Sequence, residues 1–158
     1  MCCDHWQQKR DFPSPIAQMI IVEWYDGPVA GAAICGECNA EVAFKMVAWD
    51  ENQTMRVYTL ADLPKGQFEK LSNVFAVAGP PTWPVWWPAH FPSGEERDVA
   101  WRQAQALLAT AKVATCVVAA ERLETRILRA SPAPSDEETP AESDRAAFAW
   151  WMSRMQAA

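Results

Sequence analysis

Residues 19–49 read MIIVEWYDGPVAGAAICGECNAEVAFKMVAW, and this stretch decides the fold class. Its three apolar runs are rich in β-branched, aromatic and small residues, and they are separated by the turn sequences DGP at 26–28 and GECN at 36–39. After another polar turn at 50–53, the run TMRVYTL at 54–60 has the same character. We therefore expect four antiparallel strands joined by short turns, a meander that needs a cover on one face.

The cover is expected to be helical. Asp62 precedes Pro64, a usual pairing at the start of a helix, and Phe68, Leu71 and Phe75 then recur at helical spacing. A second helix is expected to open with a capping box at 93–96. Its apolar stripe would consist of Trp101, Ala104, Leu108 and Ala111.

After the second helix, VATCVVA at 113–119 is a continuous apolar run that predicts a buried fifth strand. The segment ERLETRILRA at 121–130 fits either a short final helix or a continuation of that strand. The sequence thus predicts a single α+β domain over residues 19–130. Its architecture would be an antiparallel four- to five-stranded meander sheet covered by two or three helices.

The two ends of the chain differ from this domain. Residues 1–18 mix charges and prolines without a period, and we expect a loose extension. The segment SPAPSDEETPAESDR at 131–145 has five acids, three prolines and no large apolar side chain, which is typical of a disordered linker.

Beyond this linker, residues 146–158 place an apolar stripe on an expected amphipathic helix, formed by Phe148, Trp151, Met152 and Met155. The helix would either fold back on its own domain or dock into a groove of a partner protein. We therefore assign these four residues to partner binding or self-association.

The bulk composition limits the classes of function. The chain has 158 residues and a net charge of −6, and it shows no basic patch that would predict nucleic-acid binding. No apolar run approaches the roughly 18 residues of a membrane span, so no membrane association is expected. Five cysteines, an odd number, and a start without a signal-peptide pattern predict a reduced cytoplasmic protein.

Cys35 and Cys38 form a C-x-x-C pair between two expected strands. The pair resembles the knuckle of a rubredoxin-like zinc ribbon, and this resemblance implies a zinc ion with two further ligands. Cys3 and His5 in the N-terminal extension are the candidates for these ligands. Redox activity is an alternative, although a redox pair normally precedes a helix. A simple hairpin turn is the third interpretation.

The segment GPPTWPVWWPAHFPSG at 79–94 places Trp83, Trp86 and Trp87 among five prolines. The rings form either an aromatic platform for a sugar, a base or a proline-rich peptide, or a cover for the open face of the sheet. His90 in the same segment is a candidate general base, but no nucleophile motif accompanies it.

The leading functional hypothesis is a non-enzymatic, small acidic interaction or regulatory module that binds a protein partner. Its composition resembles that of bacterial inhibitor and immunity proteins. The alternative is a zinc-stabilised binding domain built on Cys35 and Cys38, and the third hypothesis is an enzyme that uses His90 and nearby carboxylates. The expected cofactor is therefore none, or zinc.

Overall fold

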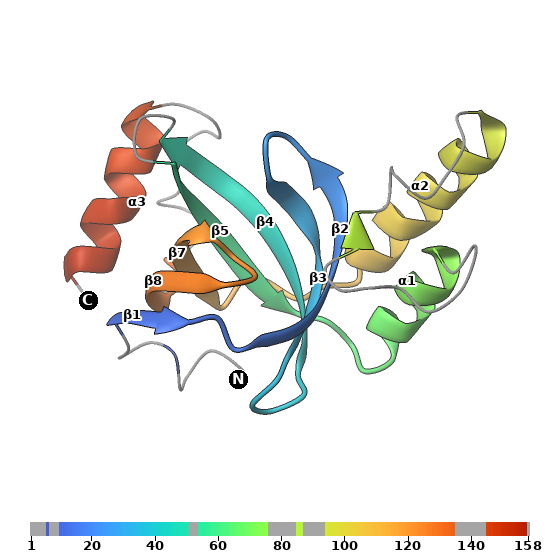
Figure 1. The fold of residues 1–158 in the computed structure, drawn as a ribbon, viewed down its shortest axis with the longest axis horizontal. Helices are drawn as coiled ribbons and strands as arrows, with labels where there is room; N and C mark the ends of the chain where they lie inside the picture. The colour runs from blue at the N-terminus through green and yellow to red at the C-terminus, as the bar shows by residue number, and fades with distance from the viewer. Residues whose placement is uncertain are drawn as a thin grey trace.

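The computed structural model describes residues 6, 10–50, 54–75, 85–86, 94–134 and 145–157. These residues form one sheet and three helices (Figure 1). The strands are β1 (Arg10–Pro13), β2 (Ile16–Trp24), β3 (Pro28–Cys35), β4 (Glu41–Asp50), β5 (Met55–Asp62), β6 (Val85–Trp86), β7 (Cys116–Arg122) and β8 (Arg126–Pro132). The helices are α1 (Gln67–Phe75), α2 (Glu95–Leu108) and α3 (Arg145–Ala157).

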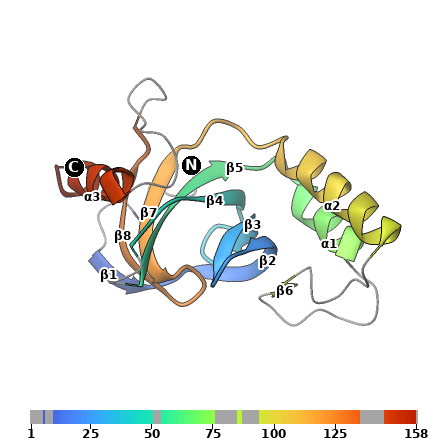
Figure 2. The same ribbon diagram turned by 90° about the horizontal axis from the view of Figure 1, so that it is seen from above.

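The sheet is larger than predicted. Its eight strands follow the order β1-β8-β7-β5-β4-β3-β2-β6, and every pair is antiparallel except the short parallel contact of β6 with β2. The meander from β2 to β5 occurs as expected. The prediction of four or five strands under a helical cover is wrong, because the sheet continues through β7, β8 and β1 and curls into a half-barrel (Figure 2).

The curl lets the inner face of the sheet bury itself. Strand residues alternate between the two faces, and the inward set from β2, β3, β4, β5, β7 and β8 forms one core without a helix. Members of this core include Met19, Ile21, Ala33, Cys35, Val42, Phe44, Tyr58, Leu60, Cys116, Val118, Ala120 and Ile127. A helical cover is therefore unnecessary on this face.

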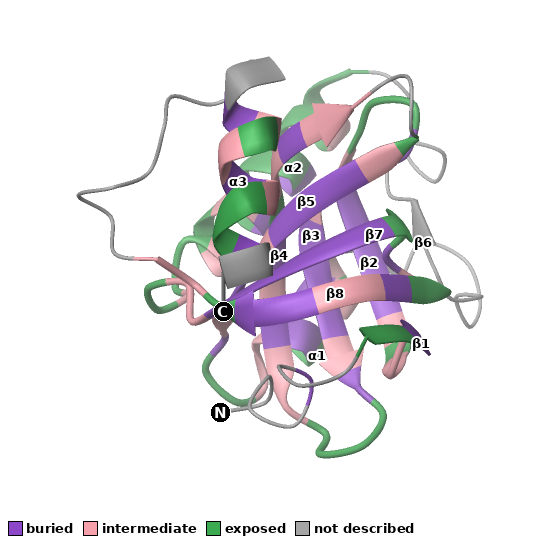
Figure 3. Ribbon diagram, turned by 90° about the vertical axis from the view of Figure 1, so that its left-hand side faces the viewer, coloured by how far each residue is buried: buried purple, intermediate pink, exposed green. Residues whose placement is uncertain are grey.

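The helices pack on the outer face in two separate places. Helices α1 and α2 cover β2 and β3, where Phe68, Leu71 and Ala104 meet Ile20 and Ala32. Helix α3 covers the outer side of β4, β5 and β7. Strand β7 is consequently buried on both faces along most of its length (Figure 3), which explains its continuous apolar sequence.

Several residues of the segment expected to be a loose extension are strand residues. Strand β1 pairs with β8, and the Asp11 carboxylate accepts hydrogen bonds of 2.7 and 2.8 Å from the guanidinium of Arg126. The chain then passes directly from β1 to β2 (Figure 1). At this link Ser14 donates to the carbonyl of Thr125 at 2.8 Å, while the carbonyl of Pro15 accepts from Gly36 at 2.7 Å. The link thereby joins two distant parts of the sheet.

Segment 121–130, for which helix and strand remained open, forms the end of β7, the turn of a hairpin and most of β8. Helix α2 also differs from its prediction. Gly94 stands at its N-cap, and no side chain caps it. Trp101 is 40% exposed, while Ala100 and Ala104 make the buried side of the helix. The predicted stripe is confirmed at Ala104, Leu108 and Ala111 and is wrong at Trp101, whose place on the buried side is taken by Ala100.

Candidate functional site

The candidate site is a cavity at the end of the half-barrel where β2 and β4 end and β5 begins. Strands two apart in a meander run in the same direction, so their ends meet at one edge of the sheet. The hairpin turn between β7 and β8 reaches the same end. This end cavity has a volume of about 630 Å³ and is lined by Ile21, Trp24, Asp26, Gly27, Pro28, Trp49, Thr54, Arg56, Glu121, Arg122 and Glu124.

Arg56 holds the wall of the end cavity together. It lies on β5 opposite Trp49 of β4, its side chain is 5% exposed, and its guanidinium carbon lies 5.2 Å from the centre of the Trp49 ring. Its Nη1 donates to the carbonyl of Pro28 at 3.3 Å, and its Nη2 donates to the carbonyls of Tyr25, at 3.2 Å, and Asp26. The guanidinium group therefore fixes the turn between β2 and β3.

Gly27 makes this arrangement possible. Its φ is +140°, a conformation that other residues rarely adopt, and a Cβ atom at this position would lie 2.1 Å from Nη1 of Arg56. The turn needs glycine both for its backbone angle and for the space that the guanidinium group fills. The sequence DGP therefore both makes the turn and leaves the space in which the guanidinium group of Arg56 lies.

Tyr58 supports the same turn from inside the barrel. Its hydroxyl donates to the carbonyl of Pro28 at 2.8 Å, and its ring meets the ring of Phe44 edge to face, with centroids 6.0 Å apart. Burial raises the pKa of Tyr58 to about 12, and the charge of Arg56 only partly opposes this shift. The phenol therefore remains neutral and keeps its donor at any ordinary pH.

This raised pKa makes the effect of Tyr58→Phe depend on pH. We expect the variant to be less stable by about 1 kcal/mol near neutral pH, where it lacks one buried hydrogen bond. The folded-state pKa lies above the unfolded value of 10, so the contribution of the phenol is complete below pH 10 and is lost as the pH rises towards 12. The deficit should therefore shrink and then reverse above about pH 11. Urea unfolding of both proteins across this range measures it, and a constant deficit would contradict the raised pKa.

Aromatic side chains lie in the lining of the end cavity and next to it. Trp24 is 45% exposed and Tyr25 is 66% exposed, although both are large apolar groups. The rings of Tyr25 and Trp49 meet edge to face, with centroids 5.7 Å apart. Neighbouring exposed rings of this kind are typical of a binding surface.

The charged groups of the cavity lining are mixed. Asp26, Glu121 and Glu124 carry carboxylates, while Arg56 and Arg122 carry guanidinium groups. The Oε2 atom of Glu124 is buried and accepts no hydrogen bond from any residue that the structure describes. Glu124 thus brings to the cavity wall a carboxylate oxygen that lacks a donor among the described residues.

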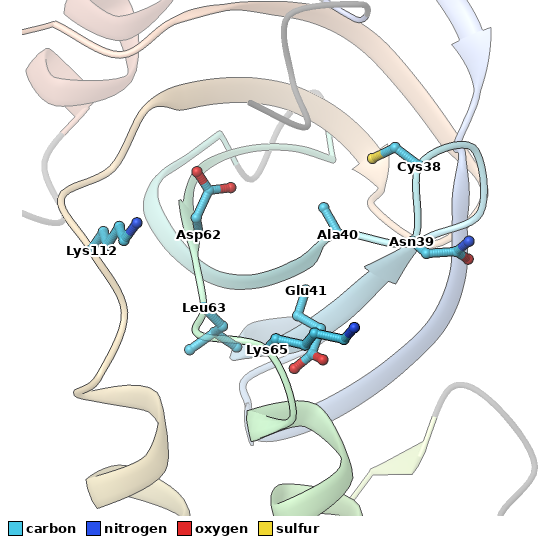
Figure 4. Close-up of a pocket in the computed structure, with 8 residues that line it drawn as sticks. All are labelled: Cys38, Asn39, Ala40, Glu41, Asp62, Leu63, Lys65 and Lys112. Atoms are coloured by element: carbon cyan, nitrogen blue, oxygen red, sulfur yellow. The ribbon is translucent and has the colours of Figure 1, made fainter.

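A second cavity of about 680 Å³ lies at the other end of the half-barrel, where β4 begins and β5 ends (Figure 4). It is lined by Cys38, Asn39, Ala40, Glu41, Asp62, Leu63, Lys65 and Lys112. The Glu41 carboxylate accepts hydrogen bonds of 2.7 Å each from the backbone amides of Gly66 and Phe68, so it caps the start of α1. In Figure 4 the side chain of Lys112 points towards Asp62. The lining of this second cavity has two carboxylates, Glu41 and Asp62, and two lysines, Lys65 and Lys112. Glu41 has a structural role as the cap of α1.

The two cysteines of the expected zinc knuckle lie in different surroundings. Cys35 is buried in the inner core, whereas Cys38 is exposed on the turn and lines the second cavity. Cys3 and His5 lie outside the described residues. Within the described ranges, no three His, Cys, Asp or Glu residues are grouped so that they could hold a metal ion. Zinc binding stays a prediction.

The aromatic platform expected at 79–94 falls largely outside the described part of the chain. Trp83, Trp87 and His90 are not described. The backbone of Trp86 belongs to β6, but its side chain is not described. The expectation that these rings bind a ligand therefore stays a prediction.

The stripe assigned to partner binding packs on the protein's own sheet. Trp151 and Met155 are 3% and 1% exposed, and Phe148 and Met152 are partly buried beside them. Arg129 of β8 donates to the carbonyl of Met155 at 3.3 Å, near the end of the helix. Of the two expected arrangements, the structure contains the one in which α3 folds back. A role in partner binding stays a prediction.

Sequence reasoning missed the end cavity. In the sequence its residues were interpreted only as strand and turn positions. One signal could have indicated the site: aromatic residues lie at the ends of two expected strands that run in the same direction, Trp24 and Tyr25 at the first and Trp49 at the second. Nothing in the sequence marked Glu124, because its place depends on a hairpin that was not predicted.

Comparison of the chain with protein-family models, with characterised protein sequences and with solved structures gives no match. No helix among the described residues is long and apolar enough to cross a membrane. The functional proposal therefore depends on the geometry of the end cavity.

Proposed function

We propose that this protein is a non-enzymatic binding module that recognises its partner at the end cavity. The observation that carries the proposal is a cavity of about 630 Å³ with two exposed aromatic side chains, Trp24 in its lining and Tyr25 against Trp49 of the lining. Ligand-binding cavities of proteins have volumes of roughly 300–1,000 Å³ and are lined by aromatic side chains with a few polar groups.

The wall of the cavity is built to keep its shape. Arg56 and Tyr58 anchor the turn between β2 and β3 through carbonyls of that turn, and Trp49 packs against the guanidinium group. A preorganised site loses less conformational entropy when it binds. The polar side chains of the lining are three carboxylates, two guanidinium groups and the hydroxyl of Thr54, beside the rings of Trp24 and Trp49. Charged and aromatic groups in this combination support recognition of a partner.

The test is a ligand-observed NMR screen of the full chain against a library of small molecules and short peptides. We expect ligands that bind the wild-type protein to lose about tenfold in affinity for the Trp24→Ala/Tyr25→Ala variant, because aromatic contact residues dominate binding energies. Trp24 is 45% and Tyr25 66% exposed, so neither belongs to the core and the variant should remain folded.

The matched control is Trp101→Ala, which removes a tryptophan that is 40% exposed on α2, away from the end cavity. Its affinities should equal those of the wild-type protein. If the double variant kept every ligand at full affinity, or if the control lost the same ligands, the end cavity would not be the binding site.

A further inference from the structure

The chemistry of the end cavity indicates what kind of group it accepts. Glu124 lines the cavity, and its Oε2 atom is buried and accepts no hydrogen bond within the described part of the chain. A buried carboxylate oxygen without a donor is costly, and a ligand that supplies an N–H group would remove this cost. The ligand is therefore expected to be a hydrogen-bond donor.

The aromatic lining favours a cationic donor. Trp24 and Trp49 both line the cavity, and the faces of indole rings attract guanidinium and ammonium groups. The protein already uses this interaction, since the Arg56 guanidinium carbon lies 5.2 Å from the centre of the Trp49 ring. A second cation can stack on the rings of the lining, of which Trp24 is exposed, while it donates to Glu124.

The two arginines of the lining do not prevent a cationic ligand from binding in the end cavity. The hydrogen bonds of Arg56 go to the carbonyls of Tyr25, Asp26 and Pro28, so its charge is directed at the turn. Arg122 is exposed to solvent, where water and salt screen its charge. Against these two cations, the lining carries the three carboxylates of Asp26, Glu121 and Glu124.

From these contacts we infer that the end cavity recognises a guanidinium or alkylammonium group, held by Glu124 and stacked on Trp24 and Trp49. The inference rests on the proposed binding function and specifies the chemistry of its ligand. The group could come from an arginine or lysine side chain of a protein partner or from a free small amine. A planar guanidinium group fits best, because it can stack and donate two parallel hydrogen bonds at once.

The first experiment compares two probes of the same shape on the wild-type full chain. Nα-acetyl-argininamide carries a guanidinium group, and Nα-acetyl-citrullinamide carries a neutral urea in its place. Titrations are followed through the indole N–H signals, with those of Trp24 and Trp49 assigned from Trp24→Phe and Trp49→Phe. We expect the arginine probe to shift these two signals and to bind at least about tenfold more tightly than the citrulline probe. Equal affinity for the two probes would overturn the inference.

The second experiment uses Glu124→Gln, which keeps the size of the side chain and removes its charge. Affinity for the arginine probe should fall about tenfold, because a charge-assisted hydrogen bond is replaced by a weaker one. The control is Glu69→Gln on the exposed side of α1, which should bind like the wild-type protein. Unchanged affinity in Glu124→Gln, with the same melting temperature as the wild-type protein, would exclude Glu124 as the recognition group.

A third comparison identifies the source of the cation and separates the two proposals. If the tripeptide acetyl-Gly-Arg-Gly-amide binds at least tenfold more tightly than the arginine probe, the cavity recognises an arginine within a protein partner. If the two bind equally, it recognises the guanidinium group alone. If neither binds while library ligands still depend on Trp24 and Tyr25, the cation inference fails and the binding function remains.

Discussion

Replacing Trp151 by alanine is expected to lower the free energy of unfolding by about 3–5 kcal/mol, the usual cost of removing a large aromatic side chain from a core. Trp151 is 3% exposed. It packs on the outer face of the sheet, against the small side chains of Ala48, Val57, Val117 and Ala119. These residues leave room for an indole ring, and none of them can extend to fill the space that the ring would leave.

Urea unfolding monitored by circular dichroism measures this loss. Trp101→Ala is the matched control, because it makes the same substitution on a helix where the ring is 40% exposed, and it should cost about 1 kcal/mol or less. Equal effects of the two substitutions would show that α3 is not held on the sheet in solution. The stripe of α3 would then be free for a partner, as the alternative interpretation of the sequence holds.

The C-terminal helix shows how far a periodic pattern can predict a structure. The stripe of Phe148, Trp151, Met152 and Met155 predicted the helix and its apolar side, because a helix of thirteen residues is marginal alone and needs a surface. The pattern could not identify that surface. The small residues against which the stripe packs lie on β4, β5 and β7, which are all distant from α3 in the sequence.

The fold was predictable where contacts are local. The turns at 26–28 and 36–39 and the strands β2 to β5 follow from residues near one another in the chain. The curl of the sheet does not, since it depends on β7, β8 and β1 pairing beyond β5. Residues 10–13 carry two charges and a proline, and their strand exists only because β8 offers a partner edge.

The candidate site could not be predicted from the sequence, because it too depends on contacts between distant residues. Trp24 and Trp49 become neighbours of one cavity because β2 and β4 run in the same direction, which a meander already implies. Glu121 and Glu124 join them through the β7–β8 hairpin, whose second strand could not be distinguished from a helix in the sequence. Arg56 looked like an ordinary polar residue of a half-exposed strand, yet it is 5% exposed.

Replacing Arg56 by methionine is expected to destabilise the protein by about 3 kcal/mol or more, because the charged donor of several hydrogen bonds is lost. Methionine keeps an apolar stem of similar length, so the packing of the strand is largely retained. The carbonyls of Tyr25 and Asp26 lose their bonds to the guanidinium group, while that of Pro28 keeps the hydroxyl of Tyr58. Arg102→Met on the exposed side of α2 is the control and should change stability by about 0.5 kcal/mol or less.

A double-mutant cycle with Gly27→Ala tests whether the guanidinium group and the glycine act together. Alone, Gly27→Ala should be strongly destabilising, because its Cβ would lie 2.1 Å from Nη1 of Arg56 at a φ of +140°. Methionine at position 56 removes the guanidinium group but not the backbone strain. The cost of Gly27→Ala should therefore be smaller in Arg56→Met than in the wild-type protein, by about 1 kcal/mol or more. Strictly additive costs would mean that the turn is set by its backbone alone, and the guanidinium group of Arg56 would then not be what fixes this wall of the end cavity.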